Sequence, residues 1–441
     1  MGRVVAHRRT RVGRPRILHH RRAKNRLHRR RSIPAGAGKR RSRRGTGEIL
    51  SFSHPMPAPG APTPSWSIPP APRKRTGAFE IVVSVIGAFA IGLSILGYLG
   101  LAGYTTTLHV AVYALVPLMI VISVLARIDR WEPEPFWTKA TAFIWGAGLA
   151  VVFSSVVNTV FLFSAEAALA DADTAMRFTT VAVAPIVEES AKGLGVLLIV
   201  LMRRETIHSV LDGAAYAGFA GAGFAFIENM QYFIAASQES MTSLTVTFIL
   251  RGAFSPFVHP MATSITGMAL AWALLHAGTA LGRLAVSASG WLGAVLLHAL
   301  WNLLAGLPTS EWFLAYLMIE VPLFTAWLAF LLRLSRLDAR SIRIGLGPYA
   351  RTGWILPGEI DLVTDEAAKK AARAWAKAGG PRATRALEEF LVALAALGLD
   401  AAIMNRRGPQ TARIAKDREL LASAASKRAE FLALVAGGGT R

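Results

Sequence analysis

The sequence feature that most constrains the fold is a series of long apolar segments that begins after Gly77. The hydrocarbon core of a bilayer is about 30 Å thick, and a helix needs about 20 mostly apolar residues to cross it. Eight segments satisfy this requirement: 78–99, 106–126, 139–163, 178–201, 210–236, 254–276, 288–307 and 312–333. Of the 441 residues, 53% are hydrophobic, which is typical of a polytopic membrane protein with polar ends. The sequence therefore predicts an all-α bundle of about eight transmembrane helices.

The charged residues between these segments predict how the bundle is oriented. Lys and Arg gather in one set of connections, at 127–139, 203–204, 283 and 333–340. The opposite set holds mainly acidic residues, with Arg177 and Arg251 as its clear basic members. The positive-inside rule then predicts a plasma-membrane protein with both termini in the cytoplasm. The stretch 240–260, which Arg251, Pro256 and Pro260 interrupt, is either a re-entrant segment or the mouth of a cavity.

The two ends of the chain are polar and are predicted to flank a transmembrane domain at 77–340. Residues 1–76 are first Arg-rich and then Pro- and Ala-rich, which predicts a disordered arm. Met56 is an alternative start that would leave the Arg-rich run out. Residues 341–441 show amphipathic helical spacing and predict a small cytoplasmic helical appendage. No aromatic residues alternate with the arginines for base stacking, so we expect no specific nucleic-acid partner. The chain has no cysteine, which excludes disulfides, thiolate metal sites and a Cys nucleophile.

Ionisable side chains inside the fourth apolar segment call for a specific reason. Glu188, Glu189 and Lys192 lie near its centre. On a helix, Glu188 and Lys192 are four residues apart and share a face, whereas Glu189 is turned by about 100°. We therefore expect Glu189 to have no helical partner of opposite sign. A charged residue at the bilayer centre costs roughly 2.5–3.5 kcal/mol on the insertion scale, so such residues are commonly functional.

Three further segments carry polar residues at the same depth. Glu228 lies next to Asn229 in the fifth segment, His259 begins the sixth, and His298 and Asn302 share a face of the seventh. Because lipid offers these groups no partners, we expect them to meet in one hydrated pocket. The glycines of the fifth segment permit helices to approach closely.

Each of these residues also has a purely structural interpretation. Glu188 and Lys192 form a common kind of neutralised pair, and the other polar groups are common as interhelical hydrogen bonds. His208, Asp212 and His276 lie near segment ends, where the membrane interface can solvate them, and we expect them to lie outside the site. The catalytic interpretation gains weight because four segments carry such groups together.

Five short motifs resemble those of the PrsW-type intramembrane proteases. They are DRWEPEPFW (129–137), EESAK (188–192), FAFIEN (224–229), FSPFVHPMATSITG (254–267) and HALWN (298–302), in the same order as in that family. The arrangement is also similar to the wider CAAX prenyl protease and bacteriocin-processing superfamily. Lys192 in place of Arg, and Glu228 in place of the first His, favour the PrsW branch.

The resemblance implies a membrane-embedded peptidase that cleaves membrane-anchored proteins. In that family, a known role is first-site cleavage of an anti-sigma factor. The predicted catalytic residues are Glu188, Glu189, Lys192, Glu228, His259, His298 and Asn302. Our hypothesis is that Glu189, assisted by Glu188, polarises a water molecule. His259 and His298, supported by Asn302, would stabilise the oxyanion or hold the water or a metal.

The metal question and two other functions stay open on the sequence. Glu189, His259 and His298 could hold a divalent metal such as zinc, but the HExxH pattern of zinc proteases is absent. A proton-coupled transporter also places carboxylates at mid-bilayer, although such proteins usually show internal repeats, and none is visible here. A non-catalytic membrane scaffold is the third alternative, with the polar ends as its binding regions.

Overall fold

The computed structural model describes residues 77–169 and 171–438, and every regular element in these ranges is a helix. The predicted arm, residues 1–76, lies outside the described residues. The membrane part consists of α1 (Ala78–Ile128), α2 (Phe136–Ile144), η1 (Trp145–Ala150), α3 (Val151–Leu169), α4 (Ala172–Phe178), η2 (Thr179–Val183), α5 (Ala184–Met202), α6 (Val210–Glu239), α7 (Met241–Phe248), η3 (Ile249–Phe254), α8 (Val258–His276), α9 (Ala280–Ala305), α10 (Thr309–Ala315), η4 (Tyr316–Glu320) and α11 (Val321–Arg351). The segments labelled η are π-helical turns.

Six helices of the described residues are long and apolar enough to cross a bilayer. They cover Ala78–Ile128, Phe136–Leu169, Val210–Glu239, Met241–His276, Ala280–Ala305 and Thr309–Arg351. The prediction of a multi-pass α-helical membrane protein is confirmed, but these six differ from the eight predicted segments. The first two predicted segments lie within α1. The fourth, 178–201, is not among the six, and it is the segment that carries Glu188, Glu189 and Lys192.

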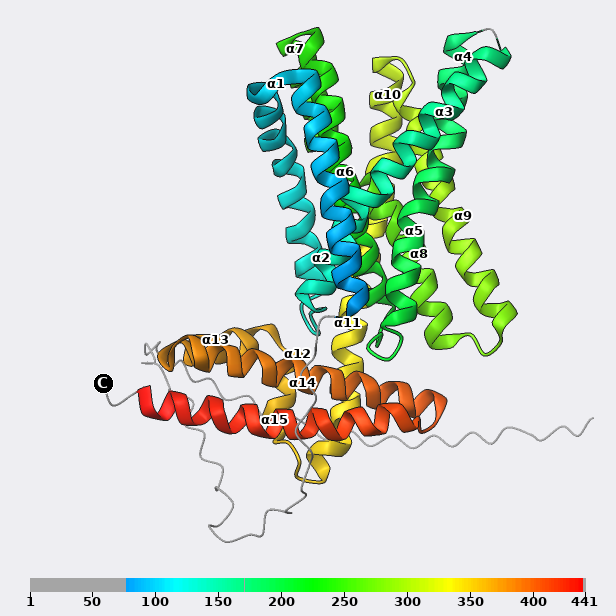
Figure 1. Ribbon diagram of the computed structural model, residues 1–441. Coiled ribbons are helices and arrows are strands. Elements are labelled where there is room, and N and C mark those ends of the chain that lie inside the picture. The colour runs from blue at the N-terminus through cyan, green and yellow to red at the C-terminus, as the bar shows by residue number, and fades with distance from the viewer. Residues whose placement is uncertain (1–76, 170, 439–441) are drawn as a thin grey trace, which may run out of the picture. The chain divides into compact units, whose positions relative to one another are not determined.

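Helix α1 reverses its direction near its middle. At 51 residues, a straight helix would be about 76 Å long, far more than one membrane crossing needs. Gly103 breaks the helical backbone with a φ of 76°, a conformation that glycine adopts without steric cost. Across this break, the Thr107 hydroxyl donates to the Tyr98 carbonyl at 3.1 Å. Figure 1 shows the two halves of α1 side by side and antiparallel.

Glycines allow the central helix α6 to contact its neighbours backbone to backbone. A Cβ at Gly213 would lie 2.1 Å from the Gly267 carbonyl oxygen of α8, and a Cβ at Gly223 would lie 2.1 Å from the Phe143 carbonyl of α2. Gly221 meets the His259 backbone, with a hypothetical Cβ 2.7 Å from its carbonyl. The predicted close approach around this glycine-rich stretch is confirmed, and at Gly221 it brings His259 against α6.

The C-terminal helices form a second hydrophobic core. They are α12 (Pro357–Thr364), α13 (Glu366–Ala378), α14 (Gly380–Arg407) and α15 (Thr411–Gly438). Phe390 of α14 and Phe431 of α15 are buried in this core together with Ile342 and Leu346, which belong to α11. Helix α11 thus continues without interruption from the membrane bundle into the C-terminal helices, as Figure 1 shows.

Candidate active site

The structure brings the predicted ionisable side chains together from four helices. The contributors are Glu188, Glu189 and Lys192 from α5, Glu228 from α6, His259 from α8 and His298 from α9. All are buried except Glu228, whose side chain is 15% exposed. A buried charge needs a partner within hydrogen-bonding distance, because burial removes it from water. The partners are therefore informative about the role of each residue.

Lys192 is the cation at the centre of the cluster. Its Nζ lies 2.6 Å from Glu189 Oε1 and 3.8 Å from Glu188 Oε2. It also donates to His259 Nδ1 at 3.0 Å and lies 4.1 Å above the Phe224 ring. The expectation that Glu189 has no helical partner is wrong, because residues three apart are also neighbours on a helix. Lys192 neutralises Glu189 more directly than it neutralises Glu188.

Glu189 has both carboxylate oxygens occupied by donors. Oε1 accepts from Lys192 and from His298 Nδ1, the latter at 3.0 Å, and Oε2 accepts from the Thr263 hydroxyl at 3.0 Å. The side chain is fully buried. Because His298 donates from Nδ1 to a carboxylate, its Nε2 keeps a lone pair in the neutral imidazole. Glu189 therefore holds its neighbours in place and has no free oxygen for a substrate.

Glu188 has the opposite environment. Its Oε1 accepts from Asn158 Nδ2 at 3.3 Å, while the buried Oε2 accepts no hydrogen bond within the described chain. Oε2 lies 3.8 Å from His298 Nε2. A buried carboxylate oxygen without a donor is costly, so it commonly marks a place for a water molecule or an ion. Glu188 is the carboxylate of the cluster that can still bind something.

His259 and Glu228 form a second connected pair at the edge of the cluster. Because Lys192 donates to His259 Nδ1, the imidazole donates from Nε2 to Glu228 Oε2, at 2.8 Å. Arg251 of η3 pairs with the same carboxylate, and its Nε donates to Asn229 Oδ1 at 2.8 Å. The guanidinium carbon lies 3.8 Å from the centroid of the Tyr232 ring. Glu228 is thus held by two donors from different helices.

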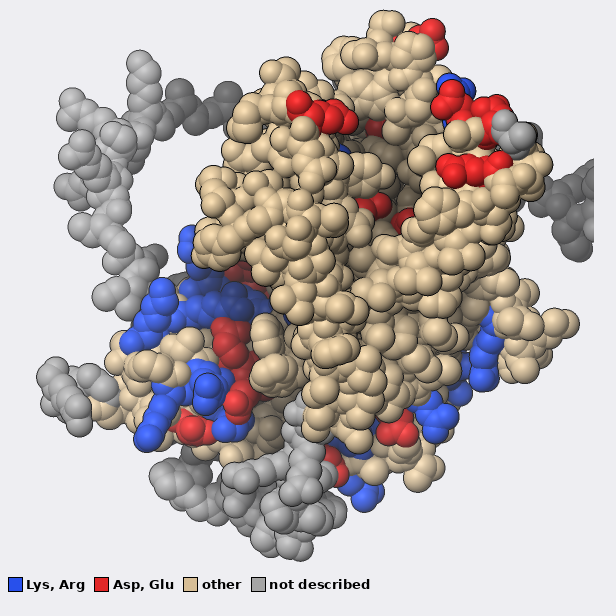
Figure 2. Space-filling view, turned by 45° about the horizontal axis from the view of Figure 1, so that its top comes forward, with Lys and Arg blue, Asp and Glu red and all other residues tan. Residues whose placement is uncertain are grey.

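A cavity of about 480 Å³ gives access to part of this cluster. Among its lining residues are Glu188, Glu228, His259, His298, Asn302 and Arg251, whereas Glu189 and Lys192 lie behind them. Figure 2 shows the hollow in the tan surface, with acidic side chains visible in its depth. The interrupted stretch before α8 contributes Arg251, Ser255 and Pro256 to the wall, which favours the cavity interpretation of 240–260 over the re-entrant one.

Asn302 does not contact the histidine that it was predicted to support. It lines the cavity, but its Nδ2 donates to the Thr180 carbonyl at 2.8 Å. Thr180 lies in the π-helical turn η2, and such turns disturb the regular backbone ladder and are frequent at functional sites. Asn302 therefore connects α9 to the turn that precedes α5.

The side chains that fit a metal ion differ from the predicted set. Ligand atoms of Glu188, His259 and His298 lie within 4.8 Å of one another, whereas the predicted set contained Glu189. The oxygen of Glu188 without a donor and the lone pair on His298 Nε2 suit ligand roles. Glu189 lies behind His298, in the position of the carboxylates that commonly orient metal-binding histidines. Glu188 thus replaces Glu189 in the candidate set.

Sequence reasoning missed three polar contributors. Asn158 is an isolated amide in an apolar segment, and Thr263 lies four residues after His259 on the same face of α8. The sequence therefore contains a signal for both residues: a polar side chain within an apolar segment. Arg251 was assigned to a connection outside the bundle, because an arginine that lines a cavity is indistinguishable in sequence from one in solvent. His208 and Asp212, expected to be solvated, are buried, whereas His276 is exposed as expected.

Fold and cluster together define a multi-pass α-helical membrane protein with a buried Glu–His–Lys site. In comparison with known proteins, the model of the PrsW family of intramembrane metalloproteases matches residues 134–327 of this chain. The chain is 30% identical over 125 residues to Protease PrsW of Clostridioides difficile (strain 630), a match that covers 28% of this chain and 50% of that protein. The chain thus spans about half the length of this curated relative. No solved structure matches. The predicted resemblance to the PrsW-type family is confirmed.

Proposed function

We propose that this protein is an intramembrane endopeptidase that cleaves membrane-anchored proteins with a water molecule activated by Glu188. The observation that carries the proposal is Glu188 itself: its buried Oε2 lacks a donor, and the residue lines a cavity together with both histidines. Hydrolysis of an amide needs a base for the attacking water and donors for the developing oxyanion. Both kinds of group line this cavity.

The contacts favour a division of roles within the cluster. Glu188 takes the proton of the water, because Glu189, the base in our initial hypothesis, has no free oxygen. Arg251 lines the same cavity and supplies a donor for the oxyanion, whereas the Nε2 proton of His259 is directed at Glu228. Lys192 does not line the cavity; it fixes Glu189 and the tautomer of His259. Glu228 in turn keeps His259 and Arg251 in position.

A divalent metal such as zinc fits this arrangement. Glu188 Oε2, His298 Nε2 and His259 would hold it, which resembles the His and carboxylate sets of catalytic zinc sites. Such an ion polarises a carbonyl and lowers the pKa of bound water. To act as a ligand, His259 would have to release Glu228, and Arg251 would then be the remaining donor to that carboxylate.

The topology supports a substrate that reaches the site from the side opposite the C-terminal helices. We propose eight crossings, because α1 reverses at Gly103 and α4 to α5 adds the segment that carries the glutamates. Both termini then lie in the cytoplasm. A juxtamembrane segment of a membrane-anchored protein, such as an anti-sigma factor, would enter the cavity in extended form, since only an extended backbone exposes its amides.

The proposal is tested by comparing the membrane proteomes of cells that carry wild type or Glu188→Gln. We expect at least one membrane-anchored protein to accumulate uncleaved with the variant, and the purified wild type to cleave that protein in detergent. Glu311→Gln, at an exposed position of α10, is the matched control and should behave as wild type. Identical proteomes would refute the peptidase. Solute flux into liposomes without cleavage would support the transporter, and an unchanged cellular phenotype with Glu188→Gln would support the scaffold.

Replacement of Arg251 should slow cleavage without unfolding the bundle. Loss of one oxyanion donor costs about 10²–10³-fold in kcat, so Arg251→Met should fall in this range. Arg251→Lys retains the charge but loses the second hydrogen bond, to Asn229, and should be intermediate. Arg177→Met, at an exposed arginine of α4, is the control. The measurement is initial cleavage rate in detergent, and full activity of Arg251→Met would remove Arg251 from the mechanism.

A further inference from the structure

A second group of ionisable side chains lies at the opposite end of α6. Asp212 is in the first turn of this helix, whereas Glu228 is sixteen residues, or about 24 Å, further along. Four carboxylates line one small cavity there: Asp129, Glu132, Asp212 and Asp338. The cavity measures about 10 Å³, which is close to the smallest volume that admits a water molecule. It therefore suits one small ion.

These carboxylates outnumber the cations that neutralise them. Lys139 Nζ lies 3.0 Å from Asp129 Oδ2. Across residues 77–169 and 171–438, no Lys or Arg forms an ion pair with Glu134, Asp212 or Asp338. Buried carboxylates without a counter-charge pay a desolvation penalty and repel one another. The cluster thus has an unbalanced negative charge.

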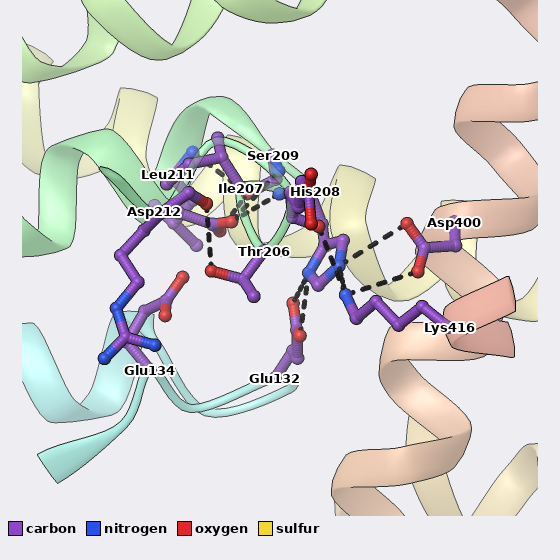
Figure 3. A network of polar contacts seen from close by, with 12 residues as sticks. Glu132, Glu134, Thr206, Ile207, His208, Ser209, Leu211, Asp212, Asp400 and Lys416 are labelled. Carbon is purple, nitrogen blue, oxygen red and sulfur yellow. Dashed lines mark hydrogen bonds and ion pairs between the residues drawn. The ribbon is translucent and has the colours of Figure 1, made fainter. Parts of the chain in front are cut away.

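Glu134 supplies an independent sign of a missing partner. The residue is 6% exposed, and its Oε2 accepts from the Tyr216 hydroxyl. Its Oε1 is buried and accepts no hydrogen bond. Figure 3 shows Glu132 and Glu134 on the same loop, with the carboxylate of Glu134 turned toward the side of Asp212.

His208 completes the group with a nitrogen ligand. Its Nδ1 lies 2.8 Å from Glu132, and ligand atoms of Glu132, His208 and Asp212 lie within 4.8 Å of one another. On its other side, Nε2 lies 3.5 Å from Asp400 of α14 and 2.9 Å from Lys416 of α15, as Figure 3 shows. Because an ammonium group can only donate, Lys416 donates to Nε2, and the proton of the neutral imidazole lies on Nδ1, directed at Glu132. To bind an ion, Nδ1 would have to give up this proton, and Nε2 would then donate to Asp400, the usual support of a metal-binding histidine.

We propose that a divalent cation binds at the edge of this cavity, through Glu132 and Asp212, which line it, and through the adjacent His208. The ion would offset the negative charge of these carboxylates and of Asp129, Asp338 and Glu134. Carboxylate oxygens suit Mg²⁺ and Mn²⁺, and the imidazole nitrogen favours Mn²⁺ among these two. The ligands come from the loop after α1 and from the start of α6. The ion would therefore fasten the loop to α6, and through His208 and Asp400 it would join this region to the C-terminal helices.

The test is Mn²⁺ binding by the full chain in detergent, measured by the loss of the free-ion signal in electron paramagnetic resonance. We expect Glu132→Gln and Asp338→Asn to lose one bound Mn²⁺ per chain or to bind it at least about tenfold more weakly. Mutation of residues that only support the metal ligands already lowers affinity by about this factor. Glu188→Gln should retain this ion, which separates it from any ion in the candidate active site. The result does not depend on the proposed peptidase activity.

The control is Asp361→Asn, which removes an exposed carboxylate of α12 whose partner is Arg343. It should bind Mn²⁺ as wild type does. The proposal would be overturned if the wild type bound no Mn²⁺. It would also be overturned if Glu132→Gln and Asp338→Asn both bound Mn²⁺ as the wild type does. Because Glu132 lies in a loop and Asp338 on a half-buried face of α11, at least one variant is expected to fold, and elution as a single species confirms it.

Discussion

Glu188→Gln is expected to abolish cleavage while the protein stays folded. Glutamine has the same shape and can keep the contact with Asn158, so packing around α5 is preserved. It cannot accept a proton from water, and loss of a general base costs about 10²–10⁴-fold in rate. The measurement is the single-turnover cleavage rate of an identified substrate in detergent, with the unfolding temperature recorded on the same samples.

The contrasting variant is Glu189→Gln. This change removes the charge that Lys192 and His298 contact, and it leaves a buried lysine without its nearest carboxylate. Breaking a buried pair from one side typically costs about 3–5 kcal/mol, so we expect this variant to unfold at a lower temperature. If Glu189→Gln were stable but inactive while Glu188→Gln still cleaved, the two glutamates would have to exchange roles.

Gly213→Ala is expected to produce a large loss of stability. A methyl group at this position would lie 2.1 Å from the Gly267 carbonyl oxygen and 2.7 Å from the Ala271 Cβ. Because the first of these atoms is backbone, α6 and α8 must move apart. Overpacking of a core typically costs about 1–3 kcal/mol, and a backbone clash belongs at or above the upper end. Separation of these helices would also displace His259 from Glu228.

The matched control is Gly92→Ala in α1, where a Cβ would meet no atom within 4 Å. Alanine is the better helix former by about 1 kcal/mol, so this control should be neutral or slightly stabilising. Thermal unfolding in detergent, followed by circular dichroism, measures both variants. Equal unfolding temperatures for Gly213→Ala and wild type would contradict the close crossing of α6 and α8.

The sequence predicts much of this fold because each membrane helix is encoded locally. Apolar length and the positions of Gly, Pro and Arg suffice to place most of the helices, and Gly379 separates α13 from α14. The reversal of α1 at Gly103 also corresponds to the gap between two predicted segments. The number of membrane crossings is harder to predict from the sequence. A helix such as α5, which carries charged residues within an apolar segment, resembles neither a typical transmembrane helix nor a soluble one.

The composition of the site could be predicted, but its pairing could not. Spacing on a helix allowed Lys192 to reach either Glu188 or Glu189, and the choice depends on His298 and Thr263 from other helices. Arg251 lies in a π-helical turn that directs it into the site, and the spacing of apolar residues does not predict such a turn. At the other end, His208 is buried where it contacts Lys416 of the C-terminal helices, and such a long-range contact has no local signature in the sequence.

Helix α11 has a practical consequence for biochemical work. It begins in the bundle, and its outer half carries Ile342 and Leu346 into the second hydrophobic core. Gly345 there meets the Gly398 backbone of α14, leaving no room for a side chain. A chain divided after residue 340 would therefore be cut inside α11, just before Ile342. Soluble expression of residues 341–441 alone would begin inside a helix and should yield a poorly folded fragment.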